Sequence, residues 1–150
     1  HLDRHGTMQH YAAIKERLDP APLERKLASL AELPDLEAKL VGVSQVVLPR
    51  LDEVHSLAVA LHAMNVRGRP VAMHAPAYMR DWFGSIARSV RELVAPHAAE
   101  LRVKPSRLAQ IYTTLLFASR MPHVAPKDRL GPEELVSICL RGALAATRER

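Results

Sequence analysis

The last third of the chain, residues 101–145, holds two apolar segments on either side of a proline-rich loop, and these segments constrain the fold most. The first begins at Pro105, whose fixed backbone angle suits a first helical position, and Ser106 is expected to cap the helix. Apolar residues then recur at helical spacing to about Met121, just before Pro122. They cover more than the roughly 100° stripe that a surface helix needs. One face can therefore serve the core while another binds a partner.

The final segment has the same character. Pro132 suits a first helical position, two glutamates follow it at the positive end of the helix dipole, and Arg148 lies near the other end. Gly142 and the alanine after it permit a neighbouring backbone to approach closely. Two such helices predict a four-helix interface between two identical subunits. The residues expected to form it are Leu108, Ile111, Leu115, Val136, Leu140, Ala143 and Leu144.

Two short motifs mark these segments: Leu101-Arg102-Val103 followed by Pro105, and the run 134–144, Glu-Leu-Val through Leu-Arg-Gly-Ala-Leu. They resemble the penultimate and last helices of TetR-family transcriptional regulators of the actinobacterial type. The resemblance covers residues 101–145. It implies that these helices form a homodimer interface and that the preceding helices form an effector pocket. The family's N-terminal helix-turn-helix, which contacts DNA, has no matching stretch here.

Composition favours a single all-α domain over residues 1–150. A chain of 150 residues with 48% hydrophobic content can bury a core without disulfides or metal. Aromatic residues make up only 4%, and β-branched residues do not alternate with polar ones over the length of a strand. We expect an antiparallel helical bundle of about six helices, the last two of which form the dimer interface.

Helical phase predicts where the earlier helices lie. A short helix is expected from Thr7 to Leu18 and a second from about residue 19 to Leu33. The third should begin after the capping Asp35 and continue to about Asn65. Pro49 lies inside this phase, so we expect it to kink or split the helix.

A loop is expected at residues 65–76, which contain a glycine and two prolines, and it is a candidate pocket mouth. The next helix should carry apolar residues from Tyr78 to His97 and bend or end at Pro96. The range 99–119 could also form a helix-turn-helix, but its second helix is too apolar to face DNA. Dimer packing explains that helix better.

The chain is basic, with a net charge of +5, yet its charges do not form a nucleic-acid surface. The densest group comprises the arginines at positions 67, 69, 80, 88 and 91. Asp81 and Glu92 interleave with them, and no aromatic residue is placed to stack on bases. Operator DNA is therefore expected to contact only a separate N-terminal domain.

Localisation and completeness follow from a few features. The single cysteine, Cys139, fits a reducing compartment. No apolar run is long enough to span a membrane, and the charged start has no signal-peptide core. These features predict a cytoplasmic protein. Because the chain opens on His1 without an initiator methionine, we expect residues 1–150 to be a piece of a longer protein.

No pattern in the sequence predicts an enzyme, a metal or a cofactor. His55 and His62 are seven residues apart on one helix, which separates them by roughly 10 Å. They also lack the spacing of a helical zinc motif. Cys139 lies among apolar helical neighbours, which should raise its pKa and reduce its reactivity. No serine elbow or phosphate-binding loop is present.

An apolar pocket between the central helices is the remaining candidate site, since ligands often bind between helices in mostly apolar cavities. The two histidines would supply polar groups to it. The alternative, that Trp82 and Tyr112 only fill the core, remains open because a helical stripe describes both situations. The residues expected to bind the ligand are Leu51, Val54, His55, Ala58, His62, Trp82, Ile86, Tyr112, Leu116 and Met121.

These observations predict the effector-binding and dimerisation part of a ligand-responsive transcriptional regulator, expected to be a repressor. Its partners would be a second copy of the chain and a small hydrophobic effector. The alternative is a free-standing helical protein that binds small molecules or acts as an adaptor, without a role on DNA.

Overall fold

The computed structural model describes residues 12–13, 16–65, 77–121 and 124–145, apart from the side chains at positions 58, 61–65, 77–78 and 143. Those residues form helices, with one isolated antiparallel bridge between Leu101 and Leu144. The all-α prediction is therefore confirmed for the described part of the chain. The helix expected at residues 7–18 and the loop at 66–76 lie largely outside it.

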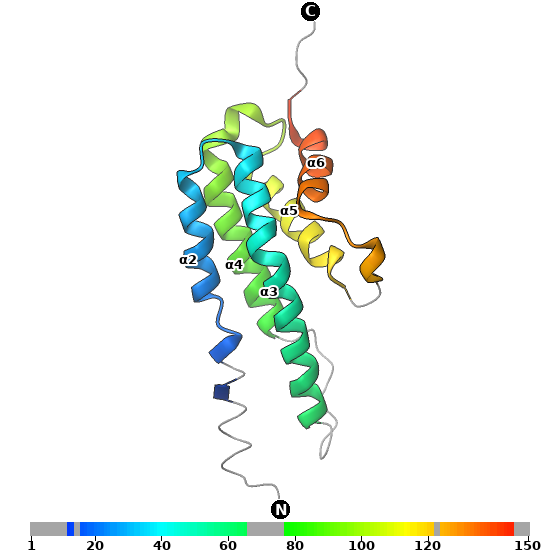
Figure 1. Cartoon of the computed structure of the whole chain (residues 1–150). Helices are drawn as coiled ribbons and strands as arrows, with labels where there is room; N and C mark the ends of the chain where they lie inside the picture. Colours follow the sequence, from blue (N-terminus) through cyan, green and yellow to red (C-terminus); the bar gives the residue numbers. More distant parts are fainter. Residues whose placement is uncertain (1–11, 14–15, 66–76, 122–123, 146–150) are drawn as a thin grey trace, which may run out of the picture.

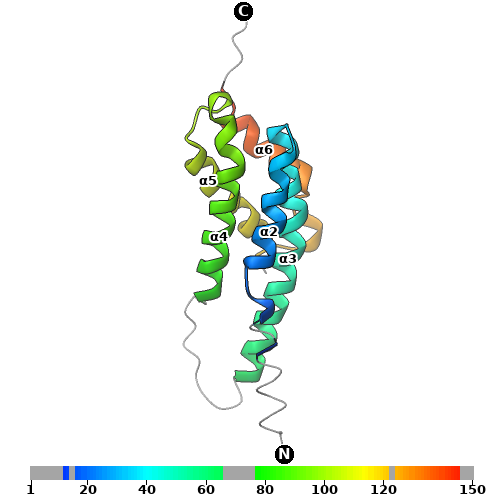
Figure 2. The same cartoon turned by 90° about the vertical axis from the view of Figure 1, so that its left-hand side faces the viewer.

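Three helices lie side by side with their long axes aligned: α2 (Ala21–Ser29), α3 (Leu36–Asn65) and α4 (Ala77–Val94) (Figure 1). The view turned by 90° shows that α3 runs in the direction opposite to α2 and α4 (Figure 2). The helix α5 (Pro105–Ser119) packs mainly on α4. The last helix, α6 (Pro132–Ala143), packs on α3 and α5.

Short 3₁₀ turns connect these helices: η1 (Leu30–Glu32), η2 (Ala95–Glu100) and η3 (Pro126–Asp128). The helix α4 passes into η2 at Ala95, so the expected change at Pro96 is confirmed. Proline lacks the N–H that would continue the α-helical hydrogen bonds, which accounts for the end of α4 there.

The start of α3 also agrees with the sequence prediction. Asp35 caps this helix by accepting a hydrogen bond from the backbone N–H of Ala38 at 3.2 Å. At Pro49 the sequence left a kink or a split open; α3 continues through it as one helix of 30 residues, so the split does not occur. Packing of its neighbouring turns, at Val47, Leu48 and Leu51, keeps the helix intact.

Two details of the last helices differ from expectation. The side chain of Ser106 does not cap α5, because the residue at the cap position is Lys104, whose side chain makes no capping bond. The helix α6 ends at Ala143 rather than near Arg148. Leu144 is extended, and the N–H of Ala145 donates to the carbonyl of Glu100 at 3.1 Å. Pairing with the segment at Leu101 therefore replaces the last expected turn of helix.

The core is continuous and includes buried residues from all five α-helices. Its largest fully buried side chains are Trp82, Tyr112, Leu27, Leu40, Leu48, Ile86, Leu108, Leu116 and Leu135.

Candidate functional site

Most of the residues predicted to bind a ligand lie in this packed core. Each of them has 5% or less of its surface exposed, and together they come from α3, α4 and α5. The structure therefore brings them together as buried neighbours in the core. These residues are Leu51, Val54, Trp82, Ile86, Tyr112 and Leu116.

The polar atom of Trp82 is occupied by the protein itself. Its indole N–H donates to the carbonyl of Leu18 at 2.5 Å, and the guanidinium of Arg50 lies 5.5 Å from the ring centroid. Arg50 also donates to the carbonyl of Arg17 at 2.5 Å and pairs with Glu53 at 2.7 Å. The hydrogen bond to Arg50 is the main cause of a lowered pKa of the Glu53 carboxyl. The segment before α2 and one turn of α3 thus cover the Trp82 ring.

Tyr112 is satisfied in the same way. Its hydroxyl donates to the carbonyl of Leu40 at 2.5 Å and forms a second hydrogen bond with the hydroxyl of Ser44. Both partners belong to α3, so Tyr112 ties α5 to α3 within the core. Burial raises the pKa of the Tyr112 hydroxyl well above its usual value.

The remaining predicted ligand residues do not join that cluster. His55 is exposed on α3, and Met121, directly after α5, is 42% exposed. The side chains of Ala58 and His62 lie outside the described part of the structure.

The residues predicted to form a dimer interface fall into two groups. Leu108, Val136 and Leu140 are 6% exposed or less and belong to the core of the single chain. Ile111 and Leu144 are 38% and 41% exposed, and Leu115 is partly buried against the core. The side chain of Ala143 lies outside the described residues. Only the second group offers surface to another molecule.

The last two helices carry much of the exposed apolar surface. Among the described residues, six large hydrophobic side chains are exposed, and four of them lie between positions 111 and 144. Three are on α5, on α6 or directly after α6, and we call Ile111, Ile138 and Leu144 the outer apolar residues. Ile138 is 56% exposed although it lies beside the buried Cys139.

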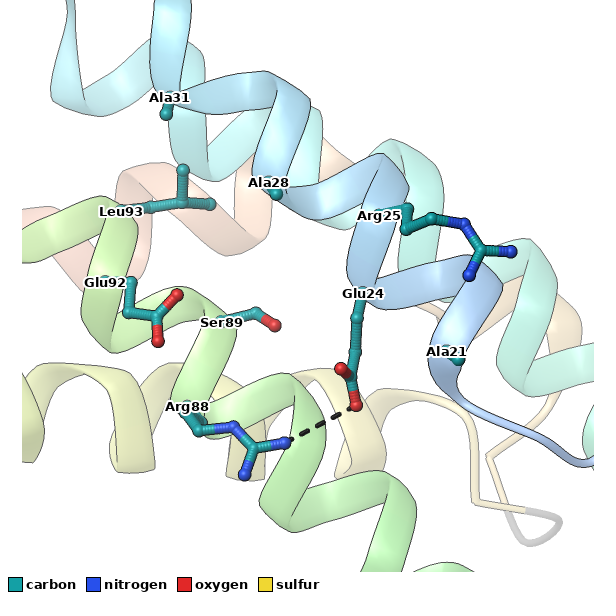
Figure 3. A pocket seen from close by; sticks show the side chains of 9 residues that line it. All are labelled: Ala21, Glu24, Arg25, Ala28, Ala31, Arg88, Ser89, Glu92 and Leu93. Carbon is teal, nitrogen blue, oxygen red and sulfur yellow. Dashed lines mark hydrogen bonds and ion pairs between the residues drawn. The ribbon is translucent and has the colours of Figure 1, made fainter.

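A surface groove of about 510 Å³ lies between α2 and α4, and we call it the α2–α4 groove (Figure 3). Its floor is apolar and its walls carry two arginines, two glutamates and a serine. None of the residues predicted to bind a ligand lines it or the three smaller pockets found on the described part of the chain. The lining residues are Ala21, Glu24, Arg25, Ala28, Ala31, Arg88, Ser89, Glu92 and Leu93.

One end of this groove is organised by hydrogen bonds between its walls. The carboxylate of Glu24 on α2 accepts a hydrogen bond from the hydroxyl of Ser85 at 2.6 Å. The same oxygen accepts one from the guanidinium of Arg88 at 3.4 Å. Ser85 and Arg88 lie one turn apart on α4, so Glu24 connects the two helices and restrains Arg88.

Sequence reasoning missed this groove, although a signal was present. Ala21 and Ala28 are seven residues apart, hence on one side of α2, and Ala31 follows three residues later. Alanine side chains are short, so this side of α2 fills little of the space between α2 and a neighbouring helix. From the sequence alone, Arg88 and Glu92 were interpreted only as part of a possible nucleic-acid surface.

A buried polar cluster joins α3 to η2. Lys39 is 4% exposed, and its ammonium lies 2.9 Å from Nε2 of His97 and 3.5 Å from the carbonyl of Leu93. The Nδ1 atom of His97 lies 2.7 Å from the carboxylate of Glu100. Lysine is rarely buried without such partners. The cluster therefore fastens the start of α3 to the end of α4.

The chemistry of Cys139 agrees with its apolar setting. It is 7% exposed, and burial raises the pKa of its thiol to about 11, as the sequence predicted in direction. Within the described residues, no three histidine, cysteine, aspartate or glutamate side chains are grouped so that they could hold a metal ion. No helix in that part of the chain has the length and apolar character needed to cross a membrane.

Comparison with known proteins gives two partial similarities. Over 63 residues the chain is 41% identical to a UDP-N-acetylmuramoylalanine--D-glutamate ligase of Rhizobium meliloti, covering 42% of this chain and 14% of that protein. Over 18 residues it is 94% identical to the protein of the same name from Mesorhizobium japonicum, covering 12% and 4% respectively. The chain thus spans a small part of the length of these relatives. No protein-family model and no solved structure matches it.

Proposed function

We propose that this chain is the sensing and dimerisation part of a ligand-responsive transcriptional regulator similar to the TetR family. In this proposal the helices form an antiparallel bundle, and α5 and α6 pair with the same helices of a second copy. A ligand bound to the chain would favour one arrangement of the two subunits over another. DNA-binding heads carried by the subunits would then match their operator in only one arrangement. We expect the regulator to be a repressor.

The observation that supports the proposal most is the exposure of the outer apolar residues. Large apolar side chains left exposed on a folded chain are candidates for a contact with another protein. Ile111, Ile138 and Leu144 lie on or beside the two helices that resemble the family's dimerisation helices. A second copy of the chain would remove them from water.

The dimer part of this proposal is tested with the full chain in solution. Sedimentation should return about twice the monomer mass of 16.7 kDa at micromolar concentration. A monomer at that concentration would contradict it. Fusion of the chain to a DNA-binding head that needs dimerisation should also restore operator binding. Failure of the fusion to bind would contradict a regulator that acts as a dimer.

The regulatory part is tested by the reading frame upstream of the His1 codon. A helix-turn-helix encoded there would support the regulator. An initiator methionine at or just before His1 would instead favour the free-standing helical binding or adaptor protein.

The two partial similarities favour a second candidate, a part of a ligase of the kind that they name. This candidate is tested by incubating the chain with UDP-N-acetylmuramoylalanine, D-glutamate, Mg²⁺ and ATP, whose cleavage drives formation of the amide bond, and following product by chromatography. The regulator proposal predicts no product. Turnover that increases in proportion to the amount of chain would overturn it in favour of the ligase.

A further inference from the structure

We propose that the α2–α4 groove binds a zwitterionic ligand of the amino-acid class that carries an apolar side chain. The carboxylate would bind Arg88, the ammonium would bind Glu92, and the side chain would lie on the apolar floor. This inference rests on the proposed function for the ligand's role as effector. The binding site itself stands on the groove alone.

The charges of the groove are balanced and belong to both walls. Arg25 and Glu24 come from α2, and Arg88 and Glu92 come from α4. Glu24 is engaged by Ser85 and Arg88, whereas Arg25 and Glu92 form no ion pair with any residue of the described chain. A ligand with one charge of each sign matches this lining better than an anion or a cation does.

Arg88 is prepared to bind a carboxylate. Glu24 restrains its guanidinium through one nitrogen at 3.4 Å, and Ser85 in turn restrains Glu24 at 2.6 Å. A guanidinium has five N–H donors, and its planar shape suits two parallel hydrogen bonds to a carboxylate. The Arg88 side chain is 57% exposed, so donors not directed at Glu24 are accessible from solvent.

The spacing on α4 fits the two charged groups of an amino acid. Arg88 and Glu92 are four residues apart, which places them on one face of the helix about 5–6 Å apart at their Cβ atoms. Ser89 lies between them, and Figure 3 shows its hydroxyl directed toward α2. A carboxylate on Arg88 thus leaves the adjacent ammonium close to Glu92 and to the Ser89 hydroxyl.

The floor of the groove determines what the ligand's side chain must be. Ala28, Ala31 and Leu93 lie beyond the charged groups, toward the end of α2 (Figure 3). The volume of about 510 Å³ falls in the range of small-molecule sites, about 300–1,000 Å³. A bulky apolar side chain such as that of phenylalanine would cover the alanines, whereas a small or charged one would leave them wet.

The test is isothermal titration calorimetry of the full chain with L-phenylalanine, which measures the dissociation constant. Two further probes each lack one charge: 3-phenylpropanoate has no ammonium, and 2-phenylethylamine has no carboxylate. We expect each to bind at least about tenfold more weakly than phenylalanine, because each loses a charge-assisted hydrogen bond. Equal affinities for the three probes, or no binding of phenylalanine at millimolar concentration, would overturn the proposal.

Two variants test which side chain binds the carboxylate of the ligand and which binds its ammonium. Arg88→Gln should weaken binding of phenylalanine and 3-phenylpropanoate but leave 2-phenylethylamine unchanged. Glu92→Gln should weaken binding of phenylalanine and 2-phenylethylamine but leave 3-phenylpropanoate unchanged. Arg91→Gln is the matched control, since Arg91 is an exposed arginine of the same helix outside this groove. An effect of Arg91→Gln as large as that of Arg88→Gln would refute the assignment. Ala28→Phe, which fills the floor without removing a charge, should abolish binding of all three probes.

Failure of this inference is distinguishable from failure of the proposed function. Phenylalanine binding by a monomeric chain whose fusion does not bind operator would support the amino-acid site and contradict the regulator. A chain that dimerises but binds none of the three probes would contradict only the amino-acid site.

Discussion

The interior around Trp82 and the outer side of α5 and α6 were indistinguishable in the sequence, since both are rows of apolar residues at helical spacing. The structure separates them. Trp82 and Tyr112 are fully buried, with their polar atoms bonded to Leu18 and Leu40, whereas Ile111 and Ile138 are 38% and 56% exposed. Apolar periodicity therefore shows that a helix has packed faces, but not whether a given face meets its own chain or another molecule.

The largest expected effect tests the packed side of this comparison. Trp82→Ala should lower the free energy of unfolding by about 3–5 kcal/mol, because it removes a fully buried side chain and leaves a cavity. Urea denaturation followed by circular dichroism measures the change. The control is Val59→Ala on α3, which is 56% exposed and should change the value by less than about 0.5 kcal/mol. A loss below about 1 kcal/mol for Trp82→Ala would mean that the interior is loose enough to hold a ligand.

The next effect tests the outer side. Ile138→Glu should leave the monomer folded and weaken dimerisation by about 100-fold, because a charge would have to be buried in the subunit contact. Sedimentation across a concentration series measures the dissociation constant. Val59→Glu is the matched control, since Val59 and Ile138 are each 56% exposed and Val59 lies on α3. Equal weakening by both variants would remove α6 from the interface.

Much of the fold followed from the sequence because its signals were local. The prolines at positions 96, 105 and 132 marked helix boundaries, and the Asp35 cap marked the start of α3. The points that the sequence left open or predicted wrongly were at places where tertiary contacts decide the structure. Pro49 stays inside α3 because the turns around it are packed, and α6 stops at Ala143 because the next residues pair with the segment at Leu101.

The candidate site was less accessible from the sequence. A groove depends on how far apart two helices lie, and α2 and α4 are more than forty residues apart along the chain. The spacing of Ala21, Ala28 and Ala31 indicates that one side of α2 carries small side chains. It does not identify which helix lies opposite that side. The hydrogen bond between Glu24 on α2 and Ser85 on α4 shows that the helix opposite is α4.

The third prediction compares neighbouring residues of α6. Ile138 faces outward, whereas Cys139 is 7% exposed and burial raises the pKa of its thiol from 9.0 to about 11. A group whose pKa is raised by folding stabilises the fold fully below its unfolded pKa, and this contribution is lost as the pH rises through the folded pKa. The free energy of unfolding should therefore fall by about 2 kcal/mol between pH 9 and pH 11.

Urea titrations at pH 8 to pH 11 measure this loss, and Cys139→Ala separates the thiol from other groups. Tyr112 contributes in the same direction from about pH 10, because burial also raises its pKa above that ordinary value. The variant should show a shallower decline than the natural chain up to pH 11. Parallel declines would mean that the thiol reaches solvent, and Cys139 would then belong with Ile138 on the outer side.

Two glycines lie inside different helices of the molecule. Gly84 lies inside α4 and Gly142 inside α6, and a methyl group at either would meet no other atom within 4 Å. Alanine should therefore raise the free energy of unfolding of the monomer by about 0.5–1 kcal/mol at both positions, since glycine is the poorer helix former. The two variants should differ only in their effect on the dissociation constant of the dimer. If a neighbouring backbone approaches α6 at Gly142, Gly142→Ala weakens dimerisation while Gly84→Ala leaves it unchanged, as sedimentation of the two variants would show. Stabilisation at both positions with no change in dimerisation would place the subunit contact away from Gly142, and the interface would then depend on Ile111 and α5.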